Sequence, residues 1–148
     1  MPIMDVTYPE GALTPEARDT LIEELTTVLL RAERAPDTDF FRSVTWVFVH
    51  EVPHVYTAGK PAEQSIFRID ATTPQGALSD RRRGELVANA TDAVQRAANI
   101  PDDQLLRVFV LCHEVDEGSW GAAGQVVQFA ALRETAAAER AKAEEPVG

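Results

Sequence analysis

The sequence of this 148-residue chain is a tandem repeat, and the repeat constrains its fold more than any other feature. Residues 5–14 return as residues 70–79 with matching residue types, an offset of 65 positions. The same offset relates further pairs along the two halves, and a His-Glu-Val triplet follows in both. We therefore expect two copies of one supersecondary unit, residues 1–59 and 66–124, in a single domain.

Each copy is predicted to form a strand, a helix and a second strand. Thr14 and Ser79 are the residues expected to cap the two helices, and each helix should end before a proline, at Pro36 and Pro101. Short segments rich in β-forming residues flank the helices: residues 3–8, 44–49, 66–72 and 105–111. Strands joined by a helical crossover pair in parallel. The sequence thus predicts an α+β fold with a four-stranded mixed sheet and two helices on one face.

The second strand of each copy carries apolar side chains toward both faces, in residues 46–49 and 108–111. Such strands are typical of a sheet that is covered on both sides. Two helices can cover only one face of four strands, and no other element is long enough to cover the second face. We therefore expect a partner subunit on the second face.

The composition restricts the possible partners. A formal net charge of −10 and an isoelectric point near 4.7 argue against binding to nucleic acid or to anionic membranes. No run approaches the ~18 apolar residues that cross a bilayer, and the first residues do not resemble a signal peptide. A cytoplasmic location is expected. Cys112 is the only cysteine, which favours a small core residue over a nucleophile.

Two other segments have simple interpretations. Residues 50–54 match the letters of the zinc-protease pattern H-E-x-x-H, but that chemistry needs both histidines on a helix. Here the run ends a β-type segment and contains Pro53, so no metal is expected. The domain should extend over residues 1–129, and residues 130–148 predict a solvated helix or a frayed tail.

Pro2 is the residue with the most distinctive chemistry. One interpretation is a proline that only begins an edge strand. If Met1 is removed, however, Pro2 becomes a free secondary amine, and an α-amine has a pKa of about 7.7–8.0 that an apolar pocket lowers. Such an amine can take a proton from a carbon next to a carbonyl group near neutral pH.

Several short motifs resemble the tautomerase superfamily. The opening residues Pro2-Ile3, the pair Glu10-Gly11 and residues 19–22 are similar to the start of 4-oxalocrotonate tautomerase. The doubled unit, the turn at 36–39 and the ending at 120–129 resemble malonate semialdehyde decarboxylase and its long-chain relatives. The resemblance implies the tautomerase/MIF-like fold, a homotrimer with the sheets inside and the helices outside, and chemistry without cofactor or metal.

The resemblance also implies roles for individual residues. Pro2 matches the catalytic proline, and Asp39 matches an aspartate that assists the chemistry of the decarboxylase. The repeat counterpart of Pro2 is Phe67, so one proline site per subunit is expected. Antiparallel pairing of the two first strands, together with the family's apolar wall, implies four substrate-binding residues: Thr73, Gln75, Trp120 and Phe129.

The chain departs from the family at the arginines that hold substrate carboxylates, where Ala12, Trp46, Pro74 and Ala77 stand instead. We therefore expect an isomerase, a keto–enol tautomerase-like enzyme that prefers neutral or monoanionic enols to dicarboxylates. One alternative is a decarboxylase or hydratase of a small oxo-acid. Another is an inactive trimeric binding or structural member of the superfamily.

Overall fold

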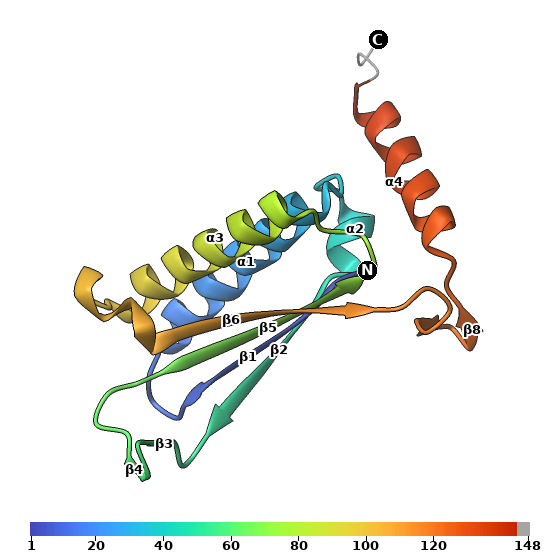
Figure 1. Cartoon of the computed structure of the whole chain (residues 1–148). Helices are drawn as coiled ribbons and strands as arrows, with labels where there is room; N and C mark the ends of the chain where they lie inside the picture. The colour runs from blue at the N-terminus through green and yellow to red at the C-terminus, as the bar shows by residue number, and fades with distance from the viewer. Residues whose placement is uncertain (145–148) are drawn as a thin grey trace.

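The computed structural model describes residues 1–144, and Figure 1 shows that they form one sheet with helices packed on one side. The first repeat contains β1 (Ile3–Pro9), α1 (Pro15–Glu33), α2 (Asp39–Ser43) and β2 (Trp46–Val52). The second contains β5 (Phe67–Pro74), α3 (Asp80–Ala98), the 3₁₀ turn η1 (Asp102–Arg107) and β6 (Val108–Val115). Two small hairpins and a last helix complete the chain: β3 (Tyr56–Thr57) with β4 (Lys60–Pro61), β7 (Gly121–Ala122) with β8 (Gln125–Val126), and α4 (Phe129–Glu144).

The main sheet has the strand order β2-β1-β5-β6. β1 pairs in parallel with β2, and β5 pairs in parallel with β6, as expected for strands joined by a helical crossover. The two repeats meet where β1 runs antiparallel to β5, with Ile3 opposite Thr72 and Thr7 opposite Arg68. The predicted four-stranded mixed sheet is confirmed. The antiparallel junction relates the two repeats by an internal pseudo-twofold axis.

Local capping explains where the two long helices begin and end. The Thr14 side chain accepts a hydrogen bond from the Ala17 N–H at 3.1 Å, and the Ser79 side chain accepts one from the Arg82 N–H at 3.3 Å. Arg34 and Asn99 follow the helices in the left-handed conformation that commonly ends a helix. Both predicted N-caps are confirmed, and both helices end before the predicted prolines.

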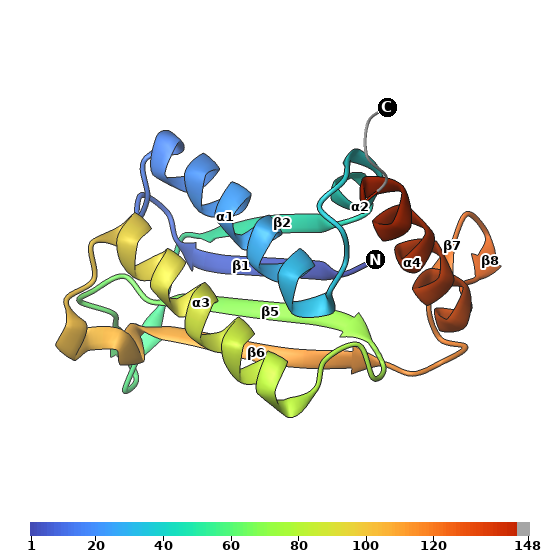
Figure 2. The same ribbon diagram turned by 90° about the horizontal axis from the view of Figure 1, so that it is seen from above.

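The core lies between the sheet and the pair α1 and α3, which cover the same face in Figure 2. β1 contributes Met4, Val6 and Tyr8 to it, and α1 contributes a buried leucine stripe. The other face of the sheet is open in the single chain. Trp46 on β2 is 56% exposed there, and Phe109 on β6 is 62% exposed. The prediction that the two helices cover one face only is confirmed.

The predicted starts of the second strands were wrong by two or three residues. β2 begins at Trp46, because residues before it form the short helix α2, whose N-cap Thr38 accepts a hydrogen bond from the Phe41 N–H. β6 begins at Val108, because η1 occupies the residues before it. In both places a local turn displaces the β-forming residues from the strand.

The H-E-x-x-H letters lie in β2 and the turn after it, where His50 contacts Asp5 on the neighbouring strand at 2.6 Å. Within residues 1–144, no group of three or more His, Cys, Asp or Glu side chains is arranged to hold a metal ion. No helix in the same range is both long and apolar enough to cross a bilayer. Cys112 is partly buried against the core, and burial raises the pKa of its thiol.

Candidate active site

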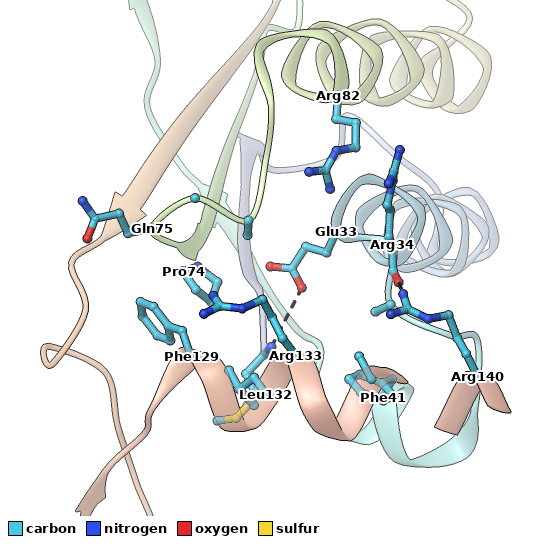
Figure 3. Close-up of a pocket in the computed structure, with 15 residues that line it drawn as sticks. Glu33, Arg34, Phe41, Pro74, Gln75, Arg82, Phe129, Leu132, Arg133 and Arg140 are labelled. Atoms are coloured by element: carbon cyan, nitrogen blue, oxygen red, sulfur yellow. Dashed lines mark hydrogen bonds and ion pairs between the residues drawn. The ribbon is translucent and has the colours of Figure 1, made fainter. Parts of the chain in front are cut away.

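A cavity of about 270 Å³ opens at the amino terminus of the chain. Its walls come from Met1, the end of α1, the turn after β5, the first turn of α3 and one side of α4. Figure 2 shows α4 beside the amino terminus, and Figure 3 shows the side chains that face the cavity. Phe41, Phe129 and Leu132 supply apolar surface to it. Elements distant in sequence thus enclose the first residue of the chain.

Pro2 follows Met1 in the chain and does not itself line this cavity. Its side chain is buried, and its carbonyl oxygen accepts a hydrogen bond from the Trp46 N–H at 3.2 Å. The amine that faces the cavity belongs to Met1, since Met1 is present in this structure. While Met1 remains, the Pro2 nitrogen is part of an amide and has no basic lone pair.

The four predicted substrate-binding residues fall into two groups. Gln75 and Phe129 line the cavity. They are also joined through Glu117, whose N–H donates to the Gln75 side-chain oxygen and whose carboxylate accepts from the Phe129 N–H. Thr73 and Trp120 are buried and do not form part of the cavity wall.

Asp39, predicted to assist the chemistry, is the first residue of α2 and is exposed. It does not line the cavity in the single chain. The structure therefore brings Gln75 and Phe129 to the amino terminus and leaves Asp39 outside the cavity.

Glu33 is a cavity residue that the sequence analysis missed. It is the last residue of α1, its side chain is only 8% exposed, and its Oε2 lies 3.9 Å from the amine nitrogen of Met1. Within residues 1–144, its Oε1 is buried without a hydrogen-bond partner. A signal was present in the sequence: Glu33 follows Leu25 and Leu29 at helical spacing, so an acid occupies a core-facing position of α1.

Burial dominates the electrostatics of this pair. It raises the pKa of the Glu33 carboxyl, against the opposing attraction of the Met1 amine and of Arg82. It also lowers the pKa of the Met1 amine, against the opposing effect of Glu33. Both displacements favour the uncharged forms. Burial in this site thus weakens the charged form of each group relative to the same group in water.

Four arginines surround the cavity: Arg34, Arg82, Arg133 and Arg140. Arg82 donates to the Ala32 carbonyl at 3.0 Å, and Arg140 donates to the Arg34 carbonyl at 2.6 Å. Among the described residues, Arg133 on α4 makes no side-chain hydrogen bond or ion pair and faces the cavity in Figure 3. The family's arginine positions did not point to these four cations, because they come from the end of α1, from α3 and from α4.

Comparisons with known proteins agree with this fold. A family model described as "Tautomerase enzyme" matches residues 67–130, which cover the second repeat. The fold is shared with a fused 4-OT, solved as an asymmetric trimer (21% identity, 88% of this chain and 98% of that one, TM-score 0.72). It is also shared with Pt0534 inactivated by 2-oxo-3-pentynoate (20% identity, 88% of this chain and 98% of that one, TM-score 0.71).

A third similar structure is N1, a member of the cis-3-chloroacrylic acid dehalogenase family (18% identity, 97% of this chain and 92% of that one, TM-score 0.71). No curated protein matches the sequence. The second repeat thus matches the tautomerase family model, and the chain shares its fold with these solved structures over most of its length.

The buried acid predicts an unusual pH dependence of stability. Because the pKa of Glu33 is raised by folding, its ionisation destabilises the folded chain as the pH rises above the ordinary value of 4.5. Glu33→Gln should match the wild type at acidic pH and become more stable than the wild type as the pH rises to neutral, because the glutamine has no charge to bury.

Urea unfolding between acidic and neutral pH measures this difference. Glu16→Gln, an exposed change at the other end of α1, is the matched control and should not change the free energy of unfolding. A wild type that gains stability over Glu33→Gln as the pH rises would show that attraction to the amine and Arg82 outweighs burial.

Proposed function

We propose that the chain is a keto–enol tautomerase-like enzyme in which Pro2, freed by removal of Met1, is the general base and acid. The observation that carries the proposal is the cavity at the amino terminus, a partly apolar space of substrate size that is lined by Met1, the residue bonded to Pro2. Burial lowers the pKa of the Met1 amine at this place, and the same burial would favour the neutral form that a general base needs.

The proposed reaction moves one proton between two positions of a small carbonyl compound or its enol. The Pro2 amine removes a proton from the carbon next to the carbonyl and delivers it in the reverse direction. Phe41, Phe129 and Leu132 keep the space apolar around the base. Asp39 stays a predicted polar assistant on the basis of the family resemblance.

One observation favours the alternative of a small oxo-acid hydratase or decarboxylase. The Glu33 carboxyl lies in the same cavity, and a buried carboxylate can activate a water molecule for addition. An inactive binding or structural protein is the remaining alternative. Pro2-dependent turnover of a simple enol separates the enzymes from that alternative.

The Pro2 amine can be tested by covalent labelling. An amine adds to the alkyne of 2-oxo-3-pentynoate, forming one N–C bond while a proton moves to carbon, and this reagent inactivated the similar protein Pt0534. We expect one equivalent of label on Pro2, located by mass spectrometry of peptides, together with loss of turnover.

A variant that retains Met1 should lose both labelling of Pro2 and nearly all turnover, because its Pro2 nitrogen is an amide. Pro2→Ala keeps an amine and should keep part of the activity. Full turnover by protein shown by intact mass to carry Met1 would overturn the proposal.

We also propose a homotrimer, with the open faces of the sheets packed together and α1 and α3 outside. Exposed aromatic residues on that face, Trp46, Phe48 and Phe109, support an interface. The face is not uniformly apolar, since Asp5 contacts His50 and Asp70 contacts His113 at 2.6 and 2.8 Å. These paired polar groups can be buried between subunits at a lower cost than unpaired ones.

Charge placed on the open face should break the trimer. We expect light scattering to give the mass of three chains for the wild type and of one chain for the double variant Phe48→Asp and Phe109→Asp. Val87→Asp, on the outward side of α3, is the control and should remain trimeric. A wild type that is a stable monomer at micromolar concentration would contradict the proposal.

Arg133 is the cation that we propose for a substrate carboxylate, which refines the expected preference to monoanionic enols. Arg133→Ala should raise KM about tenfold for a monocarboxylate enol, because one charge-assisted hydrogen bond is lost. The KM for a neutral enol should not change. Arg96→Ala, an exposed change on α3 far from the cavity, is the control. Equal effects on charged and neutral enols would contradict this role.

A further inference from the structure

We propose that Glu33 is the second proton-transfer residue of the site, a catalytic carboxyl that exchanges a proton with the substrate oxygen while the Pro2 amine exchanges one with carbon. This inference rests on the proposed function and deepens it. It assigns the acid partner to the end of α1, where neither the resemblance nor the expected role of Asp39 pointed.

The geometry places the two groups on one cavity. Glu33 lines the space from α1, and its Oε2 lies 3.9 Å from the nitrogen of the first residue, as the dashed line in Figure 3 shows. Met1 lines the cavity and is bonded to Pro2. Loss of Met1 therefore leaves the Pro2 nitrogen and the Glu33 carboxyl facing the same space, with room for a small substrate between them.

The state of Glu33 indicates a role other than structural pairing. Within residues 1–144 its Oε1 has no hydrogen-bond partner, although its side chain is more than nine-tenths buried. Buried polar atoms in folded proteins are nearly always paired, so an unpaired one suggests that a ligand satisfies it. A substrate hydroxyl or carbonyl oxygen is a suitable partner for a carboxyl group in this cavity.

The repeat provides an independent observation. At the offset of 65 positions, the counterpart of Pro2 is Phe67 and the counterpart of Glu33 is Ala98. α1 and α3 have the same length and end at these two equivalent residues. The fold of the helix end thus does not need an acid. The acid is present only in the repeat that carries the amino-terminal proline.

The charges around Glu33 come from every element that packs near it. The Met1 amine lies just before β1, Arg82 on α3, Arg34 just after α1, and Arg133 and Arg140 on α4. Burial opposes ionisation of the acid, while Arg82 and the amine favour it. Opposing effects therefore act on the protonation of this carboxyl, which suits a group that must both give and take a proton.

The proton balance closes without a co-reactant. In the keto-to-enol direction, the neutral amine takes the proton from carbon as the C–H bond breaks, and the C=C bond forms. The Glu33 carboxylic acid gives its proton to the carbonyl oxygen. The enzyme is left with a protonated amine beside a carboxylate, and transfer of one proton between them restores the starting state. The reverse direction uses the same groups in exchanged roles.

The test uses the enol of an aryl-substituted pyruvate, followed by loss of its absorbance, with Pro2 shown by mass to be the first residue. For the wild type, the plot of kcat/KM against pH should be bell-shaped. The reason is that the Pro2 amine and the Glu33 carboxyl are active only when they hold one proton between them. Glu33→Gln should lower kcat about a hundredfold with little change in KM, and its profile should lose the basic limb.

Two further variants separate catalysis from structure. Glu33→Asp keeps a carboxyl and should retain the bell at reduced kcat. Glu16→Gln, exposed on the same helix, should behave as the wild type. Thermal unfolding that shows folded Glu33→Gln excludes loss of structure as the cause of a lower kcat.

Labelling with 2-oxo-3-pentynoate distinguishes this inference from the proposed function. The reagent needs only the neutral amine, so Glu33→Gln should still be labelled on Pro2. The pH midpoint of labelling should be lower in this variant, because the carboxylate that favours the protonated amine is gone. No label on Pro2 in the wild type would overturn the proposed function. Normal labelling with an unchanged bell and kcat in Glu33→Gln would overturn the role of Glu33 alone.

Discussion

The antiparallel pairing of β1 with β5 is the interaction on which the rest of the site depends. With Ile3 opposite Thr72, the amino terminus lies beside the carboxyl end of β5. The turn that follows β5 then brings Gln75 and the start of α3 to the first residue of the chain. A register shift of one residue would reverse the faces of the β1 side chains, so the core residues Met4, Val6 and Tyr8 also hold the terminus in place.

The elements that depend on local interactions could be predicted from the sequence, and those that depend on tertiary placement could not. The caps at Thr14 and Ser79 satisfy backbone groups within one turn, so the residues themselves predict the helix starts. Glu33 differs, because its partner amine is more than thirty residues away along the chain. Its core-facing position was visible in the leucine stripe, but the cavity beside it was not.

The places of the cavity arginines and of Asp39 also depend on tertiary placement, so they could not be predicted from the sequence. The sequence permitted either a helix or a frayed tail after Phe129, and nothing local places a helix there against the amino terminus. Only the structure shows α4 on the cavity, with Arg140 donating to the Arg34 carbonyl. Asp39 was assigned by resemblance to a turn, and the turn became the start of α2, with the side chain exposed in the single chain.

The two repeats share one backbone plan but hold different chemistry at equivalent places. At the other end of the β1–β5 junction, Phe67 occupies the position of Pro2 and lines a more apolar cavity of about 420 Å³ with Tyr8 and Arg107. That position lies inside the chain, so its nitrogen is an amide whatever residue stands there and cannot be a base. An acid near it would carry the cost of burial without an amine to exchange protons with. Ala98 removes that cost, whereas α1 retains a buried carboxyl at the end where the chain can supply a free amine.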